Sequence, residues 1–299
     1  MPARPFVLVI TLFWMTTTGW LFHRELWPRL RSGQPPPYTI DLADEALRRG
    51  PKIPWNVYWK DRKIGVVHSW LKYNESDDTF ELHSEAAKLE WGQIGPFFVY
   101  IRDLSGMHRV TREGQLRKIV ADVTILARGI GPLPALRVRA HVEGEVHNER
   151  FIPQASVDLN GTTVELPLEP VEVSSQGSVL NPLHPINRVR GLRPGQHWPM
   201  PLVNPLNDSL MALLKKDPGA ELLLQGHTGV RILQAEVLPE AQLLSWRDDE
   251  VSCLVIEYHG DDRTARTWVR EDNGLVLRQE FFSRGEQIVM ERDQAAGTP

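Results

Sequence analysis

Cysteine is almost absent from this sequence, since Cys253 is the single one among 299 residues. One cysteine cannot close an intramolecular disulfide, and it excludes any zinc site built from several thiolates. The chain also has no strong excess of charge, because 34 Lys and Arg stand against 38 Asp and Glu, a net charge of −4. Nucleic-acid-binding proteins carry a strong positive field, so we expect no nucleic-acid partner.

The short motifs that identify common enzyme classes are missing as well. The sequence has no phosphate-binding P-loop, no G-x-S-x-G elbow, no H-E-x-x-H and no C-x-x-C. Gly129-Ile130-Gly131 is followed by two prolines, so this stretch cannot open a helix onto a pyrophosphate. The sequence therefore predicts no cofactor and favours a protein that is not an enzyme.

A long hydrophobic run occurs at the amino terminus. Residues 6–22 contain no charged side chain and would span about 25 Å as a helix, the lower limit for crossing a bilayer. We interpret residues 1–34 as a single-pass membrane anchor, with a cleaved signal peptide and a soluble helix as alternatives. No Ala-x-Ala-like cleavage site follows the run, which favours an anchor that is retained. Residues 35–54, which begin with three prolines, are expected to form a linker.

The charges beside this run do not fix its orientation. Arg4 and the α-amine precede it, whereas Arg24, Arg29 and Arg31 follow it and are offset by Glu25. The positive-inside rule therefore gives nearly a tie.

Alternation of apolar and polar residues with a period of two begins at Trp55 and predicts antiparallel strands. The expected strands are 55–59, 64–70, 80–89, 115–126, 136–146, 149–159, 162–166, 222–237, 251–258, 264–270, 275–282 and 287–292. Asn160-Gly161 is the strongest hairpin signal. Residues 94–100 could be a strand or a flap over the sheet. Short helices are expected at 41–49 and after Asp208.

The predicted fold class is therefore mainly β: an N-terminal transmembrane helix plus a curved antiparallel sheet, or half-barrel, over residues 55–293. The sheet could be continuous, or it could consist of two half-sheets, 55–166 and 220–293, joined by 167–219. Residues 294–299 are expected to form a frayed tail.

Two groups of side chains are candidate sites. His141, Glu143, Glu145 and His147 share one face of a predicted strand and offer ligands that suit zinc or manganese, which would make the protein a metal-dependent hydrolase. The alternative is the solvated face of a half-exposed strand. Trp55, Trp70, Phe97 and Phe98 could line a hydrophobic ligand site, with ordinary core as the alternative. Cys253 lies in an apolar strand and is expected to be buried and inert.

Three stretches, in order along the chain, resemble motifs of one family. Residues 55–65 (WNVYWKDRKIG) resemble its opening hairpin, 191–201 (GLRPGQHWPMP) its crossing segment, and 267–280 (TWVREDNGLVLRQE) its W-V-x-x-D-G-x-V-L-R-Q-E hairpin. This family is an uncharacterised bacterial β-rich domain found before transglutaminase-like domains. Its strand pattern is similar to the extracytoplasmic half-barrels of LolA/LppX-type lipoprotein carriers.

The resemblance implies an exported, membrane-tethered β body and gives no catalytic residues. It places residues 35–299 outside the cytoplasmic membrane, with the amino terminus inside. The function expected is a membrane-anchored, non-enzymatic binding or scaffold protein of the bacterial cell envelope, with a carrier of acyl chains as the alternative. Its expected partners are the membrane, through residues 6–22, and an envelope protein or a hydrophobic ligand.

Overall fold

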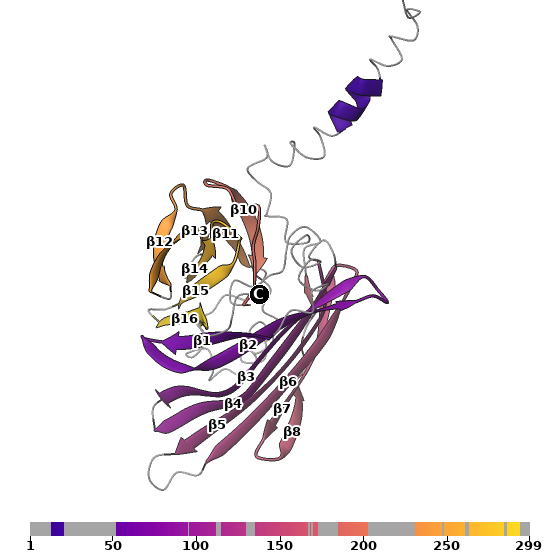
Figure 1. The fold of residues 1–299 in the computed structure, drawn as a ribbon. Coiled ribbons are helices and arrows are strands. Elements are labelled where there is room, and N and C mark those ends of the chain that lie inside the picture. Colours follow the sequence, from indigo (N-terminus) through magenta and orange to yellow (C-terminus); the bar gives the residue numbers. More distant parts are fainter. Residues whose placement is uncertain are drawn as a thin grey trace, which may run out of the picture.

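In the computed structural model of the protein, the described residues are 13–20, 52–94, 96–111, 115–129, 135–166, 168, 170–172, 185–202, 231–246, 248–260, 263–283 and 286–293. Sixteen strands in these ranges form one antiparallel sheet (Figure 1). Fourteen of them follow each other in the order β10-β11-β13-β14-β15-β16-β1-β2-β3-β4-β5-β6-β7-β8. In addition, β12 pairs with β13 and β9 pairs with β7. The expectation of a mainly β, antiparallel fold is confirmed.

The strands fall into two groups along the chain. The first group is β1 (Ile53–Trp59), β2 (Arg62–Asn74), β3 (Thr79–Ile94), β4 (Phe97–Thr111), β5 (Leu116–Gly129), β6 (Leu136–His147), β7 (Arg150–Leu159), β8 (Thr162–Leu166) and β9 (Val171–Glu172). The second is β10 (His197–Leu202), β11 (Arg231–Val237), β12 (Gln242–Trp246), β13 (Asp249–His259), β14 (Arg263–Arg270), β15 (Val276–Ser283) and β16 (Glu286–Arg292). Figure 1 shows β2 to β8 as a broad twisted sheet, with the second group curling away beyond β1.

The first and last strands hold the two groups together. Trp55 of β1 lies opposite Arg292 of β16, and Trp59 lies opposite Ile288, with an unbroken register between these pairs. The sheet is therefore continuous, which is the first of the two arrangements that the sequence left open.

The main hydrophobic core lies on one side of this sheet. Its cluster runs from Phe80 and Val110 in the first group through Trp55 and Val57 of β1 to Ile256 of β13. A second, smaller cluster lies on the other side of the second group, where Cys253 and Val255 pack with Trp246, Trp268 and Leu277. Alternation along β13 therefore buries both of its faces, because Leu254 and Ile256 belong to the main cluster.

Four strands differ from the sequence prediction. The stretch 94–100 is no flap: it forms the end of β3, a turn and the start of β4, and β4 continues to Thr111. The segment around Trp198, expected as an irregular crossing, forms the edge strand β10. The short strands β9 and β12 lie where the sequence predicts no strand.

The two edge strands of the sheet, β10 and β8, differ in composition. Pro199 and Pro201 alternate in β10 with Trp198 and Met200, whose side chains are buried in the main core. Proline has no N–H to donate, so it suits an edge strand with its nitrogen turned outward, and it discourages further pairing. The strand β8 (TTVEL), at the opposite edge of the sheet, contains no proline and is exposed along most of its length.

Residues 13–20 form a helix on which Phe13, Trp14, Met15 and Trp20 are exposed. Among the residues that the structure describes, none of the helices has the length and apolar character needed to span a bilayer. The rest of the predicted 6–22 span lies outside the described residues. The same is true of the predicted helices at 41–49 and after Asp208, and of the tail 294–299.

Candidate functional site

Five neighbouring strands, β4 to β8, present one face made almost entirely of apolar side chains. The register places Leu104, Val123, Ala140, Val157 and Val164 in one row across these strands. Directly opposite residues share a side and side chains alternate along each strand, so this row defines the whole face. The row continues through Ala86 and Val67 to Trp55, which puts it on the side of the main core.

The members of this apolar face follow from the register. They are Phe97, Val99, Ile101, Leu104, Gly106, His108 and Val110 of β4; Leu116, Ile119, Ala121, Val123, Ile125 and Ala127 of β5; Leu136, Val138, Ala140, Val142, Gly144 and Val146 of β6; Phe151, Pro153, Ala155, Val157 and Leu159 of β7; and Thr162, Val164 and Leu166 of β8. None of these side chains is an acid, a lysine or an arginine. Burial lowers the pKa of His108 to about 4, so its ring is neutral at pH 7.

Along the apolar face, the exposure of the side chains rises from the β6–β7 turn toward the β5–β6 and β7–β8 turns at the other end of the strands. Leu116 and Ile119 of β5 are buried in the main core together with Phe151 of β7. Leu104, Val123 and Ile125 are only half-buried. Leu136, Leu159 and Val164 are 37%, 46% and 49% exposed. Aliphatic surface is therefore open to contact toward the β5–β6 and β7–β8 turns.

A close backbone approach fixes the buried end of this face. Gly144 of β6 lies beside Phe151, and a Cβ at Gly144 would come within 2.3 Å of the Phe151 ring and 2.8 Å of the Ile152 carbonyl oxygen. Glycine at this position therefore lets the Phe151 ring approach the backbone of β6 closely, where the ring is fully buried.

The opposite side of β3 to β6 is polar. Arg109 donates to Glu81 at 2.6 Å, and His83 lies 3.1 Å from the same carboxylate. Burial on its own would raise the pKa of Glu81, but the hydrogen bonds from Arg109 and His83 outweigh it and lower that pKa. The two faces of the sheet thus differ sharply: one is aliphatic and the other carries paired charges.

The four predicted metal ligands lie on this polar side of β6. His141 Nδ1 is 2.7 Å from Asp122, and Lys118 pairs with both Glu143 and Glu145. The hydrogen bond to Glu143 raises the pKa of Lys118 and lowers that of Glu143. His147 lies 3.6 Å from Glu145. Within the described ranges, no three His, Cys, Asp or Glu side chains converge as a metal site would require.

The structure does not bring the four predicted ligand-binding aromatics together. Trp55 is fully buried in the main core and donates to Ser69 Oγ at 2.9 Å. Trp70 lies on the polar side, stacked on His83 at 4.9 Å between ring centroids, with the Lys52 ammonium 4.3 Å from its ring. Phe97 belongs to the apolar face, and Phe98, its neighbour, points to the other side. Two of the four are thus on each face, because side chains alternate along a strand.

Cys253 is fully buried, which confirms the expectation from its apolar neighbours. Burial raises the pKa of its thiol to about 11. The thiolate is therefore negligible at neutral pH, and this cysteine is not suited to act as a nucleophile.

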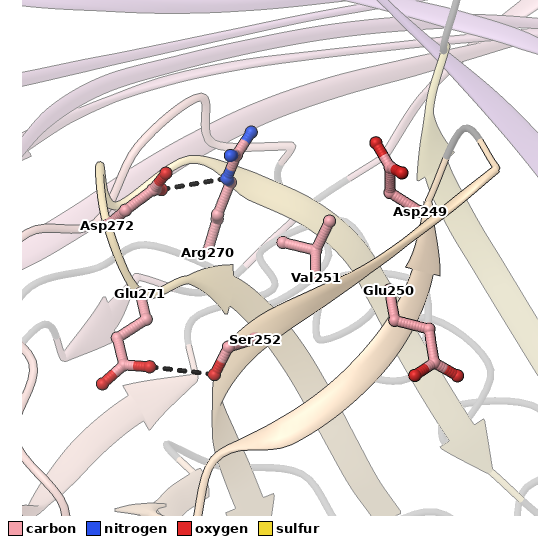
Figure 2. A pocket seen from close by; sticks show the side chains of 7 residues that line it. All are labelled: Asp249, Glu250, Val251, Ser252, Arg270, Glu271 and Asp272. Atoms are coloured by element: carbon pink, nitrogen blue, oxygen red, sulfur yellow. Dashed lines mark hydrogen bonds and ion pairs between the residues drawn. The ribbon is translucent and has the colours of Figure 1, made fainter.

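A separate pocket of about 580 Å³ lies on β13, β14 and the turn after β14 (Figure 2). Ser252 donates to Glu271 at 2.8 Å, and Arg270 Nε lies 2.9 Å from Asp272. Figure 2 shows the carboxylates of Asp249 and Glu250 pointing away from each other. The pocket is open and polar, and it lies far along the sheet from β4–β8.

Sequence reasoning missed the apolar face as a unit, although it predicted most of the strands in it. The signal was present: in β5 to β8, aliphatic residues recur at every second position while the positions between them are mainly charged or polar. What the sequence did not give is the register, which places these positions in rows. The sequence-based candidates were aromatic residues and the polar side of β6.

Comparison with known proteins adds little to this geometry. No protein-family model matches the sequence. No curated protein is similar to it at a significant level. Among solved structures, a β-barrel-like protein of the domain of unknown function DUF1849 from Brucella abortus aligns with a TM-score of 0.36 and 8% identity, over 81% of this chain and 95% of that chain. The finer resemblance, to the domain that precedes transglutaminase-like domains and to LolA/LppX carriers, stays a prediction.

Proposed function

We propose that this protein is a membrane-anchored, extracytoplasmic binding protein, not an enzyme, and that its ligand is an acyl chain held on the apolar face of β4–β8. The observation that carries the proposal is the amphipathic character of these five strands. Their aliphatic side is partly exposed toward one end, whereas their other side carries ion pairs.

The chemistry of the apolar face favours an acyl chain as occupant. Its exposed and half-buried part consists mainly of Val, Leu, Ile and Ala side chains, with the Thr162 hydroxyl, and offers no charged group to a polar ligand. Each methylene that such a face removes from water contributes about 0.8 kcal/mol, so affinity grows with the length of the chain. The surface between Leu104, Val157 and Leu136 thus suits a long, flexible and apolar ligand.

A pair of lysine substitutions on adjacent residues tests this site. Ile125 lies on the apolar face and Thr124 on the polar side of the same strand, and both are half-buried. Ile125→Lys is expected to weaken the binding of cis-parinaric acid, a fluorescent fatty acid, by about tenfold or more, because an unpaired charge would lie against the chain. Titration of the probe, followed by its fluorescence, gives the dissociation constants.

Thr124→Lys is the matched control, and its affinity should stay within about twofold of that of the unmodified protein, since its side chain points to the polar side. Both variants are compared by circular dichroism, so that misfolding is recognised. Equal loss in both variants, or no saturable binding of the probe by the unmodified protein, would contradict the proposed ligand site.

The anchor is the second part of the proposed function. It is supported by the uncharged run 6–22, by the proline-rich linker after it, and by the exposed aromatic side chains of the helix 13–20. We expect the full-length protein to sediment with membranes. Alkaline phosphatase fused after Pro299 should be active, because the enzyme folds only outside the cytoplasm. Full-length protein in the soluble fraction would contradict the anchor, and an inactive fusion would contradict the extracytoplasmic body.

A further inference from the structure

Aromatic and cationic side chains gather at one end of the first group of strands. In an antiparallel meander, the turns after β1, β3, β5 and β7 lie at the same end. Trp59, Lys60 and Arg62 flank the first of these turns, and Trp91, Phe97 and Phe98 flank the second. We call these six residues, together with Arg128 at the end of β5, the aromatic end.

A β-bulge builds the first part of the aromatic end. The β3–β4 register shifts between Glu90 and Gly92, so that Trp91 is the extra residue. The Arg62 guanidinium holds this bulge by donating to the carbonyl oxygens of Glu90 and Trp91 at 3.1 and 3.2 Å. Bulges re-aim side chains, and here the Trp91 ring stacks on Trp59 with 5.8 Å between ring centroids. The Lys60 ammonium lies 4.9 Å from the Trp59 ring, so cations surround a half-buried pair of indoles.

The second part of the aromatic end lies on β4 and β5. Phe98 is 42% exposed and pairs directly with Arg128, which is also exposed. A large apolar ring and an arginine thus lie side by side in water. A half-buried ring lies beside a cation in the same way at Trp59 and Lys60.

The opposite end of the same strands has another composition. The β2–β3 turn contains Glu75, Asp77 and Asp78, and the β6–β7 turn contains Asn148 and Glu149. These side chains are exposed, whereas the aromatic rings that flank the two turns, Tyr73 and Phe151, are half-buried and fully buried. The described turns at this end carry four acids, against one, Asp61, in those at the aromatic end, and no exposed Trp, Tyr or Phe ring flanks them. We call this the acidic end, and the contrast gives the sheet a direction.

We propose that the aromatic end docks onto an anionic lipid surface. Tryptophan rings favour the membrane–water interface, and lysine and arginine bury their aliphatic stems while their charges meet lipid phosphates. Such cations are attracted by the negative surface potential of an anionic bilayer, an attraction that salt screens. The acidic end would be repelled by the same surface, so the body takes up one orientation relative to the bilayer.

Docking in this orientation brings the open part of the apolar face to the membrane. Leu136 and Leu159, exposed members of that face, lie at the β5–β6 and β7–β8 turns, which belong to the same end as Trp59 and Phe98. An acyl chain could then pass between bilayer and sheet without crossing water. This contact goes beyond the proposed anchor, which alone would leave the orientation of the body free.

The test places one environment-sensitive fluorophore at either end of the full-length protein. In a Cys253→Ala background, a cysteine replaces Phe98 in one variant and Asp78 in the other, and each is labelled with a nitrobenzoxadiazole dye. The proteins are incorporated into vesicles of phosphatidylcholine alone, or of phosphatidylcholine and phosphatidylglycerol in equal parts. The expected result is a blue shift, with quenching by doxyl-labelled lipid, for the dye at position 98 in the anionic vesicles.

The dye at position 78 should show neither change, and high salt should reduce the response at position 98. Charge reversal by Lys60→Glu with Arg128→Glu, made on the position-98 variant, should abolish the response. Arg117→Glu, an exposed charge near the other end of β5, should leave it intact. Equal responses at both positions, no response at position 98, or a response that does not need phosphatidylglycerol would overturn the proposal. Fatty-acid binding measured on the same samples is a separate readout, so docking can fail while the ligand site stands.

Discussion

Trp55→Ala is expected to lower the free energy of unfolding by about 3–5 kcal/mol, the range for removing a buried aromatic side chain. The Trp55 ring is fully buried, and the Arg292 guanidinium lies 5.9 Å from its centroid. Truncation would leave a cavity where β1, β2 and β16 meet, and it would also leave the Ser69 hydroxyl without its donor. Urea denaturation followed by circular dichroism measures the loss.

Trp70→Ala is the matched control, because Trp70 lies on the polar side and is only half-buried. Loss of its stacking on His83 and of its contact with Lys52 should cost about 1 kcal/mol. If the two variants lost equal stability, the assignment of Trp55 to the core and of Trp70 to the polar side would be wrong.

Val289→Pro is expected to destabilise the protein by about 3 kcal/mol or more, because proline cannot donate to the sheet and its ring disturbs a central strand. Val289 lies in β16, opposite Tyr58 on one side and Glu280 on the other. This strand joins the two groups, so its disruption should separate their unfolding into two transitions. Urea denaturation monitored by tryptophan fluorescence and by circular dichroism would show transitions that no longer coincide.

Val289→Ala removes only side-chain contacts and serves as the control for the proline. Its loss should be about 1–2 kcal/mol, with a single transition retained. A proline variant that unfolds in one transition at nearly the original urea concentration would show that β16 does not connect the two groups as described.

The sequence predicted strands well wherever alternation is regular. The hairpin at Asn160-Gly161 lies between β7 and β8 as expected, with φ values of 53° and 95° that suit these two residue types. By contrast, β4 was missed beyond residue 100. Its register shifts between Ile101 and Asp103, and the extra residue breaks the period of two on which the prediction depends.

The candidate sites were harder to predict, because they depend on which strands become neighbours. The sequence placed His141 to His147 on one face of a strand, and the register agrees. The sequence could not show that Lys118 of the neighbouring strand β5 pairs with both Glu143 and Glu145. The aromatic set failed to come together because residues 55, 70, 97 and 98 were grouped by proximity along the chain. In the sheet, β-bulges and alternation decide which side each one faces.

The pairing of β1 with β16 also has a consequence for folding kinetics. Most contacts of the first group join strands that follow each other directly, so these hairpins can form locally and early. The register between Trp55 and Arg292, however, closes a loop of nearly the whole body, which makes it entropically costly. We therefore expect this closure to be a late and slow event. Until the last strand has been synthesised, the inner edge of β1 stays open, and the nascent chain is exposed to strand-mediated aggregation.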